Sequence, residues 1–339
     1  MNRMMWRSCA GAIAALGFAL SPLPAAAQQK AEISLSRQPG IFYMPSHIME
    51  KQKLIEKHAA ALGVPGVSTK WLTFSGGGAQ TDALLAGGVD ILNTGTGNLL
   101  LLWDRTRGGV KGIVATSAQP MTLISRDANI KSIKDFGPDD KIAVPTVKIS
   151  TQAIVLQIAA SEAFGADQWA KLDANTVQLG HPDAYAALSN PKHEVHNHFS
   201  IPPFTFLEMK NVPGAHVVLN SPDVMGGPLS QAQFFTTTKF ADANPKIVQA
   251  VRDATKEAQD LIRSDTKTAV DIYKEITGDK TSVEDLLAWL KEPGMMEWNL
   301  EPQGTMKFAA HLYRTGTLKT QPKAWTDYYL PVAHDLKGN

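Results

Sequence analysis

Two short segments of the chain combine glycine, hydroxyl and amide groups in a way that could bind an anion. The run Ser75–Gly78 leads into an apolar helical pattern, and Ser150-Thr151-Gln152 opens a second one. The first turn of a helix offers free backbone N–H groups and the positive end of the helix dipole, and glycine lets an anionic oxygen approach closely. Each segment is also compatible with a tight turn followed by an ordinary N-cap.

Strand-like runs precede both segments, and ligands of open α/β sheets bind at the carboxyl ends of the strands. Two further segments, Gln38–Tyr43 and Asn93–Asn98, follow such runs. Neither glycine segment is a nucleotide motif, because 76–79 lacks the Gly-Lys-Ser/Thr ending and 95–97 lacks the third glycine of a dinucleotide fingerprint. The candidate ligand-binding residues are Phe42, Tyr43, Gly76, Gly77, Gly78, Thr94, Gly95, Thr96, Ser117, Ser150, Thr151, Gln152, His198 and Ser200.

A group of histidines, His193, His196 and His198, forms the pattern H-E-V-H-N-H. Its spacing is one residue short of the H-E-x-x-H zinc helix, and the surrounding prolines argue against a long helix. An exposed loop, a metal site and a single cleft-facing histidine are the three interpretations. We expect an exposed loop without a metal, with His198 as the candidate ligand contact.

Four aromatic residues, Phe42, Tyr43, Phe204 and Trp298, could form stacking walls for a ligand. Packing in the core is the commoner role for each of them. The pair Phe42-Tyr43 is the preferred wall, because it follows a strand-like run and lies between a glycine and a proline.

The N-terminus has the three parts of a secretory signal peptide. Arg3 and Arg7 form a basic start, the apolar run Ala10–Leu20 follows, and Ala25-Ala26-Ala27 supplies a cleavage site. A membrane span needs about 20 apolar residues, so this run is too short to be one. A frayed amphipathic helix is the alternative. We expect cleavage after Ala27 and a periplasmic location.

Charge and cysteine content exclude several classes of function. The chain has 33 basic and 32 acidic side chains, and loss of Arg3 and Arg7 leaves a net charge of −1. It therefore has no polybasic field for nucleic acid or an anionic membrane surface. The single cysteine, Cys9, lies in the expected signal peptide, so no thiol nucleophile or disulfide remains. We expect no catalytic residues, no cofactor and no direct membrane insertion.

Strand-like and helical patterns alternate along the rest of the chain, which predicts parallel sheets with helices on both faces. One block spans 28–120, and the rhythm restarts over 121–225. The remainder, 226–339, is mainly helical. Within the first block we predict one helix over Pro45–Leu62 and another over Ala79–Ala86. Two such blocks in succession predict an α/β protein with two lobes.

Three stretches carry a family resemblance: FSGGGAQTDALLAGGVDILNTGTGNLL (Phe74–Leu100), TLISRDANIKSIKDFGPDDKIAVPTVKISTQAIVLQIAASEAFG (Thr122–Gly165) and QFFTTTKFADANPKIVQAVRDATKEA (Gln233–Ala258). Their order resembles the nitrate/sulfonate/taurine-type family of ABC-importer solute-binding proteins, whose relatives also bind thiamine-pyrimidine precursors. The segment Leu188–Phe204 departs from the family pattern. The resemblance implies a type II periplasmic-binding-protein fold, with central, mostly parallel sheets flanked by helices and a cleft between two lobes. One lobe would combine 28–120 with 226–339, and crossovers near 118–121 and 221–229 would form the hinge.

The resemblance also implies a monomer that closes around a small-molecule ligand and is then recognised by the transmembrane subunits of an ABC permease. We expect a small organic anion, such as a sulfonate or taurine. The alternative ligand is a neutral or aromatic heterocycle, such as a pyrimidine precursor, held by Phe42, Tyr43 and Trp298. An enzyme is the main rival function, but neither a cysteine-rich motif nor a G-x-S-x-G elbow is present. A ligand sensor without an importer is the second rival.

Overall fold

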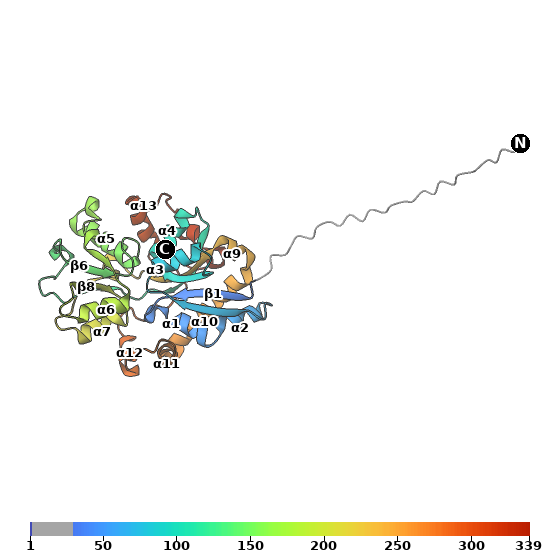
Figure 1. Ribbon diagram of the computed structural model, residues 1–339, viewed down its shortest axis with the longest axis horizontal. Helices are drawn as coiled ribbons and strands as arrows, with labels where there is room; N and C mark the ends of the chain where they lie inside the picture. The colour runs from blue at the N-terminus through green and yellow to red at the C-terminus, as the bar shows by residue number, and fades with distance from the viewer. Residues whose placement is uncertain (2–29) are drawn as a thin grey trace.

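Two five-stranded sheets, one in each lobe, organise the protein. The computed structural model describes Met1 and residues 30–339, and Figure 1 shows the two lobes side by side. The predicted signal peptide, with Cys9, falls on residues outside those described. The architecture confirms the predicted α/β class with two lobes.

The first sheet has the strand order β2-β1-β3-β10-β4. Four strands point one way, and β10 runs antiparallel to its neighbours β3 and β4. Because β10 comes from late in the chain, this lobe combines two distant parts of the sequence. Its strands are β1 (Glu32–Arg37), β2 (Ser68–Thr73), β3 (Ile91–Gly95), β4 (Val110–Ser117) and β10 (Ala232–Thr237). Its helices are α1 (Met44–Lys51), α2 (Leu54–Ala61), α3 (Gly77–Leu85), α4 (Thr96–Arg105), α9 (Thr238–Ala243), α10 (Pro245–Ser264), α11 (Thr266–Thr277), α12 (Val283–Trp289) and α13 (Thr305–Arg314).

The second sheet has the order β7-β6-β8-β5-β9 and the same design. Here β5 is the reversed strand, antiparallel to β8 and β9. Each sheet is thus mostly parallel, as predicted, with one strand reversed. The strands are β5 (Thr122–Ser125), β6 (Lys141–Val144), β7 (Thr176–Gln178), β8 (Val195–Ser200) and β9 (His216–Asn220). The helices are α5 (Thr151–Phe164), α6 (His181–Ser189), α7 (Phe204–Asn211) and α8 (Ser221–Met225).

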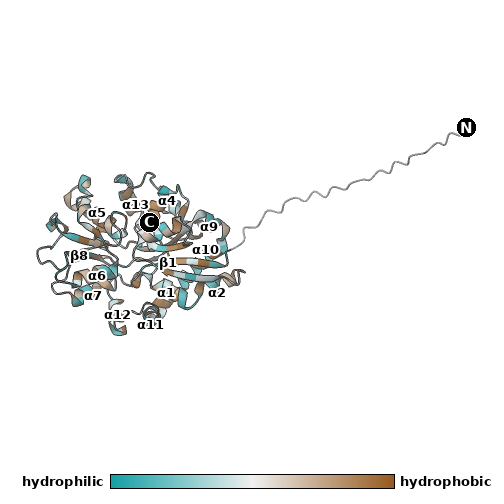
Figure 2. Ribbon diagram, viewed as in Figure 1, coloured by the Kyte–Doolittle hydropathy of each residue, from teal (hydrophilic) through white to brown (hydrophobic). Residues whose placement is uncertain are grey.

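Alternating side chains bury both faces of the first sheet, because successive residues of a strand point to opposite sides. Ile91 and Phe234 pack in the cluster that includes α1, α2 and α10. Their neighbours Leu92 and Phe235 pack in the cluster that includes α4 and α13. Figure 2 shows hydrophobic strands lying between helices whose outer faces carry hydrophilic residues.

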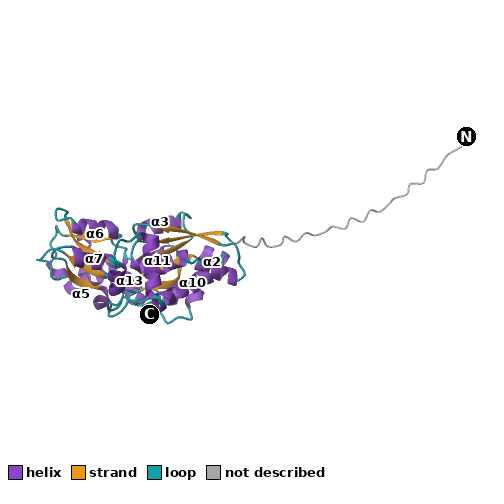
Figure 3. Cartoon of the chain, turned by 90° about the horizontal axis from the view of Figure 1, so that it is seen from below, coloured by secondary structure: helices purple, strands orange, loops and turns teal. Residues whose placement is uncertain are grey.

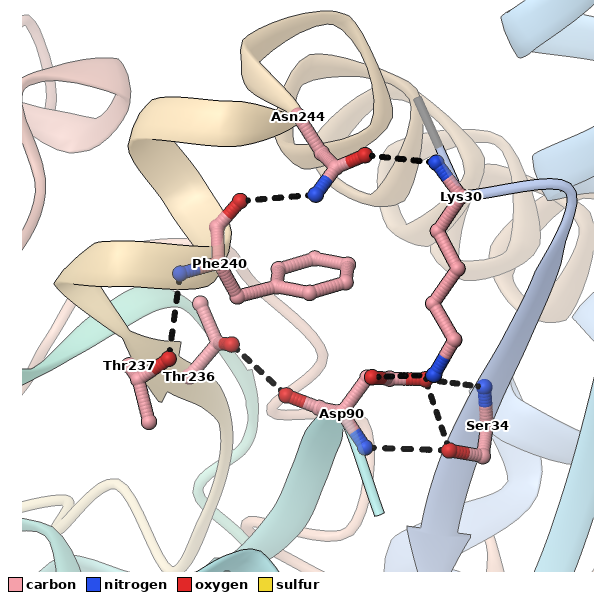
Figure 4. A network of polar contacts seen from close by, with 7 residues as sticks. All are labelled: Lys30, Ser34, Asp90, Thr236, Thr237, Phe240 and Asn244. Atoms are coloured by element: carbon pink, nitrogen blue, oxygen red, sulfur yellow. Dashed lines mark hydrogen bonds and ion pairs between the residues drawn. The ribbon is translucent and has the colours of Figure 1, made fainter. Parts of the chain in front are cut away.

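Asp90 joins the early and late parts of the first lobe (Figure 4). Its carboxylate accepts from the backbone N–H of Ser34 at 2.8 Å and pairs with Lys30 Nζ at 2.7 Å. The Thr236 hydroxyl donates to the Asp90 carbonyl oxygen at 2.6 Å, and the backbone N–H of Lys30 donates to Asn244 Oδ1 at 3.2 Å. These bonds hold β1, β3 and β10, the three central strands of the sheet, together (Figure 4).

An apolar layer continues from one lobe into the other. Leu99 of α4, Ile154 of α5 and Phe308 of α13 belong to a single core cluster. Figure 3 shows α5 and α13 on one side of the molecule and α3 and α6 on the opposite side. The lobes are therefore closed against each other along this layer.

Two predicted elements needed correction. The predicted helix over Pro45–Leu62 is two helices, because Lys53 adopts a left-handed conformation with φ 50° between α1 and α2. Two of the three histidines, His196 and His198, lie in the strand β8 rather than in an exposed loop, and β8 is in the middle of the second sheet. The flanking prolines lie outside this strand, which is buried on both faces over Asn197–Ser200.

Candidate functional site

Four helix N-termini meet along the seam between the lobes. Those of α3 and α4 come from the first lobe, and those of α5 and α6 come from the second. The backbone N–H of Gly78 in α3 donates across the seam to Thr146 Oγ1 at 3.3 Å. A Cβ atom placed on Gly95 would stand only 2.6 Å from Thr151 Oγ1. The N-terminal turns of opposite lobes are therefore in direct contact.

Two more glycines make equally close contacts at this seam. A Cβ on Gly180, the N-cap of α6, would stand 3.0 Å from the carbonyl oxygen of Ser75. A Cβ on Gly97, in the first turn of α4, would overlap the carbonyl oxygen of Ile149. Glycine at these positions lets the two backbones approach as closely as they do.

Several buried polar atoms near the seam have no hydrogen-bond partner. They are the hydroxyls of Ser117, Thr151 and Ser200 and the amide oxygen of Gln231, and each residue is at most 4% exposed. The backbone N–H of Gln231 donates to the Ser117 carbonyl oxygen at 2.9 Å, so these two side chains start from paired strands. Buried hydroxyls and amides nearly always have a partner, so these atoms are suited to receive a polar ligand.

A chain of hydrogen bonds runs from the seam into the second lobe. Glu208 Oε1 lies 2.5 Å from His198 Nδ1, His198 Nε2 lies 2.9 Å from His181 Nδ1, and His181 Nε2 lies 3.3 Å from Gln152 Nε2. A carboxylate only accepts, so His198 donates to Glu208, His181 donates to His198, and Gln152 donates to His181. The chain holds the amide of Gln152 in one orientation at the start of α5.

The two histidines of this hydrogen-bonded chain are almost fully buried. His181 and His198 are 2% and 0% exposed, and the His181 ring stacks on Phe204 with centroids 6.0 Å apart. Burial lowers the pKa of His181 well below its ordinary value, and the neighbouring His198 lowers it further. His181 is therefore a neutral hydrogen-bonding group beside the N-termini of α5 and α6.

The first lobe contributes a network of amides and hydroxyls. Gln38 Nε2 donates to Thr94 Oγ1 at 2.6 Å and to Gln80 Oε1 at 3.0 Å. Tyr43 lies in the same network, where burial raises the pKa of its phenol and hydrogen bonds with Gln38 and Thr94 act in the opposite direction. This network fixes the loop after β1 against the strand β3.

Most of the candidate residues lie at the seam, in differing roles. Gly76 and Gly78, at the start of α3, contact Pro145 and Thr146, in the turn that leads to α5, and Gly95 contacts Thr151 of α5. The helix α3 begins at Gly77, two residues before the predicted start. Ser150 is the N-cap of α5, and its hydroxyl accepts from the Ala153 N–H at 3.2 Å. The Thr96 hydroxyl is already used, since it donates to the Ser230 carbonyl oxygen. Phe42 is fully buried in the core.

The expected aromatic walls are placed differently. Trp298 is 2% exposed and packs in the core of the first lobe rather than at the seam. Trp71 packs against Phe234 and lies 5.3 Å from the guanidinium of Arg37, on the same side of the sheet. Trp298 therefore has the core role, the commoner of the two roles expected from the sequence, whereas Phe204 lies beside His181.

Sequence reasoning missed three polar residues near the seam: His181, Glu208 and Gln231. His181-Pro182 carries a usable signal, because proline favours the first turn of a helix and places the histidine at a helix start. Glu208 lies in the middle of α7, where a glutamate is usually solvated, and nothing in the sequence marks it as buried.

Two grooves open between the lobes beside the seam. One has a volume of about 580 Å³ and is lined by residues that include Gly40, Tyr185, Phe204 and Tyr273. The other has a volume of about 360 Å³ and lies near the crossovers, with Pro120 and Pro222 in its wall. In the part of the chain that the structure describes, no group of three His, Cys, Asp or Glu side chains could hold a metal ion. Over residues 30–339 no helix combines the length and apolar character that crossing a membrane requires.

Comparison with known proteins finds matches among solved structures only, since neither a family model nor a curated protein matches the chain. The alkanesulfonate-binding protein SsuA from Xanthomonas axonopodis pv. citri, bound to MOPS, has a TM-score of 0.67 at 15% identity and covers 92% of this chain and 99% of its own. The aliphatic sulphonate-binding protein SsuA from Escherichia coli has a TM-score of 0.63 at 17% identity, covering 89% and 99%. The nitrate-binding protein NrtA from Synechocystis PCC 6803 has a TM-score of 0.66 at 15% identity, covering 91% and 89%.

These matches establish the fold. The chain has the two-lobed α/β fold of periplasmic solute-binding proteins, which confirms the fold that the sequence resemblance implied. The matching structures include ligand-binding components of ABC import systems.

Proposed function

We propose that this protein is the solute-binding component of an ABC importer, which captures a small organic anion by closing its lobes and delivers it to the permease. The observation that carries the proposal is the meeting of four helix N-termini, two from each lobe, at a seam with unpartnered buried hydroxyls. Helix N-termini stabilise negative charge through their free N–H groups and their dipoles. Ligand between the lobes would join both halves and favour the closed form.

We propose that the anion is held by neutral donors and not by an arginine or lysine side chain. Arg37 ends β1, but its guanidinium pairs with Glu50 at 2.6 Å and packs beside Trp71, in the helix layer that covers the sheet. The seam offers the unpartnered hydroxyls of Ser117, Thr151 and Ser200 instead. Sulfonate, carboxylate and nitrate oxygens all fit such donors, and similar folds are named for binding sulfonates and nitrate.

A neutral or aromatic heterocycle is the second candidate ligand. It is favoured by the groove of about 580 Å³, whose wall includes Tyr185, Phe204 and Tyr273. Aromatic rings in such a wall could stack on a planar ligand.

The remaining assignments follow from the proposed transport role. The ligand-binding residues are the candidates at the seam, together with His181 and Gln231, and the segments 118–121 and 221–229 form the hinge. We propose a periplasmic, monomeric protein with a signal peptide cleaved after Ala27. Its partners would be its ligand and the transmembrane subunits of a permease, and it would not be an enzyme.

An organosulfonate is expected to raise the melting temperature of the purified protein, because it binds the closed folded form and not the unfolded chain. At 100 times the dissociation constant the stabilisation is about 2.7 kcal/mol. A thermal-shift screen with taurine, MOPS, nitrate and a pyrimidine measures the effect. A shift with the pyrimidine and none with the anions would contradict the helix-terminus site and favour the groove.

Thr151→Val is expected to weaken binding of that anion by roughly tenfold to a hundredfold, because a hydrogen bond to a charged group contributes about 1.5–3 kcal/mol. The Thr151 hydroxyl has no partner in the protein, so the free energy of unfolding of the ligand-free variant should not fall. Isothermal titration and urea denaturation measure the two effects.

Thr255→Val is the matched control. Thr255 is also fully buried, but its hydroxyl donates to the Val251 carbonyl oxygen at 2.7 Å within α10, in the layer opposite the α3 and α4 face of the sheet. This variant should lose stability and keep its affinity. Equal affinity loss in both variants would remove Thr151 from the ligand site.

A further inference from the structure

Two side-chain contacts between α7 of the second lobe and α12 of the first lobe join the lobes. Figure 1 shows α12 below α7 and beside α11. The rings of Phe206 in α7 and Trp289 in α12 stack with centroids 5.0 Å apart and planes 11° apart. One turn away, Lys210 Nζ pairs with Asp285 Oδ2 at 2.7 Å. An aromatic contact and an ion pair therefore lie side by side across two lobes.

Helical spacing explains why these two contacts form together. Phe206 and Lys210 are four residues apart in α7, and Asp285 and Trp289 are four residues apart in α12. Residues four apart lie on one face of a helix. The first residue of one pair meets the second of the other, so the two short helices lie antiparallel along a shared face.

Other residues of the same helices anchor them in their own lobes. Leu286 of α12 is fully buried in the core of the first lobe, and Leu290, which follows the helix, is 1% exposed there. Glu208 of α7 is fully buried against His198 in the second lobe. A movement of one lobe must therefore carry its helix with it and separate the two helices.

Open space flanks this contact on both sides. The groove of about 580 Å³ includes Lys210 and Asp285 in its wall, and the groove of about 360 Å³ includes Phe206. The helix pair thus bridges the lobes as a discrete contact between two grooves.

We propose that α12 is an interlobe clasp, in which Trp289 and Asp285 hold Phe206 and Lys210 and so favour the closed form of the ligand-free protein. The clasp contacts form only when the lobes are closed, so their free energy is gained on closure. A stacked aromatic pair contributes more free energy than the burial of its apolar surface alone. The exposed ion pair contributes little free energy and mainly sets how the two helices are aligned. The clasp would shift the free protein toward the binding-competent state and raise its apparent affinity.

The test measures the distance between the lobes without ligand. Nitroxide labels at Lys192→Cys in the second lobe and Lys256→Cys in the first report opening, because both positions are exposed. The only natural cysteine, Cys9, lies in the expected signal peptide, so the cleaved protein has no competing thiol. We expect a single short-distance population in the parent protein and a shift to longer distances in Trp289→Ala and in Lys210→Glu.

A charge swap and a control complete the design. The double variant Lys210→Glu/Asp285→Lys should restore the parent distance distribution, because the ion pair reforms with its signs exchanged. Lys267→Glu removes an ion pair of the same length, 2.7 Å, that lies wholly within α11, and it should leave the distances unchanged. The clasp is overturned if Trp289→Ala and Lys210→Glu keep the parent distances, or if the swap does not restore them. Because no ligand is used, either result leaves the proposed transport function to its own test.

Discussion

Gly97→Ala is expected to weaken ligand binding roughly tenfold to a hundredfold while each lobe stays folded. Gly97 lies in the first turn of α4, where alanine suits the helical backbone. Its new Cβ would overlap the Ile149 carbonyl oxygen and stand 2.8 Å from Ile154 Cδ1, and both atoms belong to the other lobe. Overpacking of this kind costs about 1–3 kcal/mol, and each 1.4 kcal/mol is tenfold in affinity. Because the overlap exists only in the closed form, the cost falls on closure.

The measurement for Gly97→Ala combines titration with small-angle scattering. The ligand that shifts the melting temperature of the parent protein is titrated, and the radius of gyration of the free variant should exceed that of the parent. Gly88→Ala is the control, because a Cβ on Gly88 would meet only the Ala83 carbonyl oxygen at an ordinary 3.5 Å. Parent-like affinity and size in Gly97→Ala would show that α4 and α5 do not have to meet for binding.

The sequence predicts elements well where the signals are local. The helix α5 begins where the sequence places its start, because Ser150 caps it. The helix break at Lys53 was missed, because a left-handed lysine carries no local signature of a turn. The two-lobed α/β fold follows from the alternation of such elements, which is also a local property.

The candidate site depends on which elements meet, and that is only partly visible in the sequence. The sequence marks the starts of α3 and α5 as possible anion sites. In the structure Gly78 of α3 bonds to Thr146, five residues before α5, and it is Gly95, before α4, that contacts Thr151 of α5. The partners of His198 were not expected, since Glu208 and His181 meet it only because α6 and α7 pack side by side on the sheet in the folded lobe. A buried polar chain of this kind is set by the packing of helices on a sheet rather than by spacing along the chain.

The clasp residues also combine a feature that the sequence predicts with one that only the fold determines. The four-residue spacing within each helix is readable from the sequence, and it shows which side chains share a face. That Trp289 would meet Phe206 requires the second lobe to lie against α12, and only the structure supplies this placement. The spacing therefore predicts which residues of α7, and which of α12, lie on one helix face. The fold determines that these two faces meet.

Acid is expected to destabilise the protein from about pH 6.5 downward through its buried histidines. His47 and His181 are 3% and 2% exposed. Burial, and then the charge of Arg37, lowers the pKa of His47 to about 3. Burial, and then His198, lowers the pKa of His181 well below its ordinary value. Below pH 6.5 the unfolded chain takes up protons at these rings that the folded chain does not bind, so the free energy of unfolding falls as the pH falls.

His47 is the better residue for testing this effect, because its ring packs edge-on against Tyr273 at 5.5 Å inside the first lobe, on the helix layer that covers the sheet. Each such histidine lowers the free energy of unfolding by about 1.4 kcal/mol per pH unit below 6.5, so His47 accounts for roughly 2 kcal/mol between pH 6.5 and 5. Urea denaturation of the parent and of His47→Gln across this range measures the difference. The variant should lose about that much less stability on acidification, and parallel pH profiles would show that His47 is protonated in the folded protein.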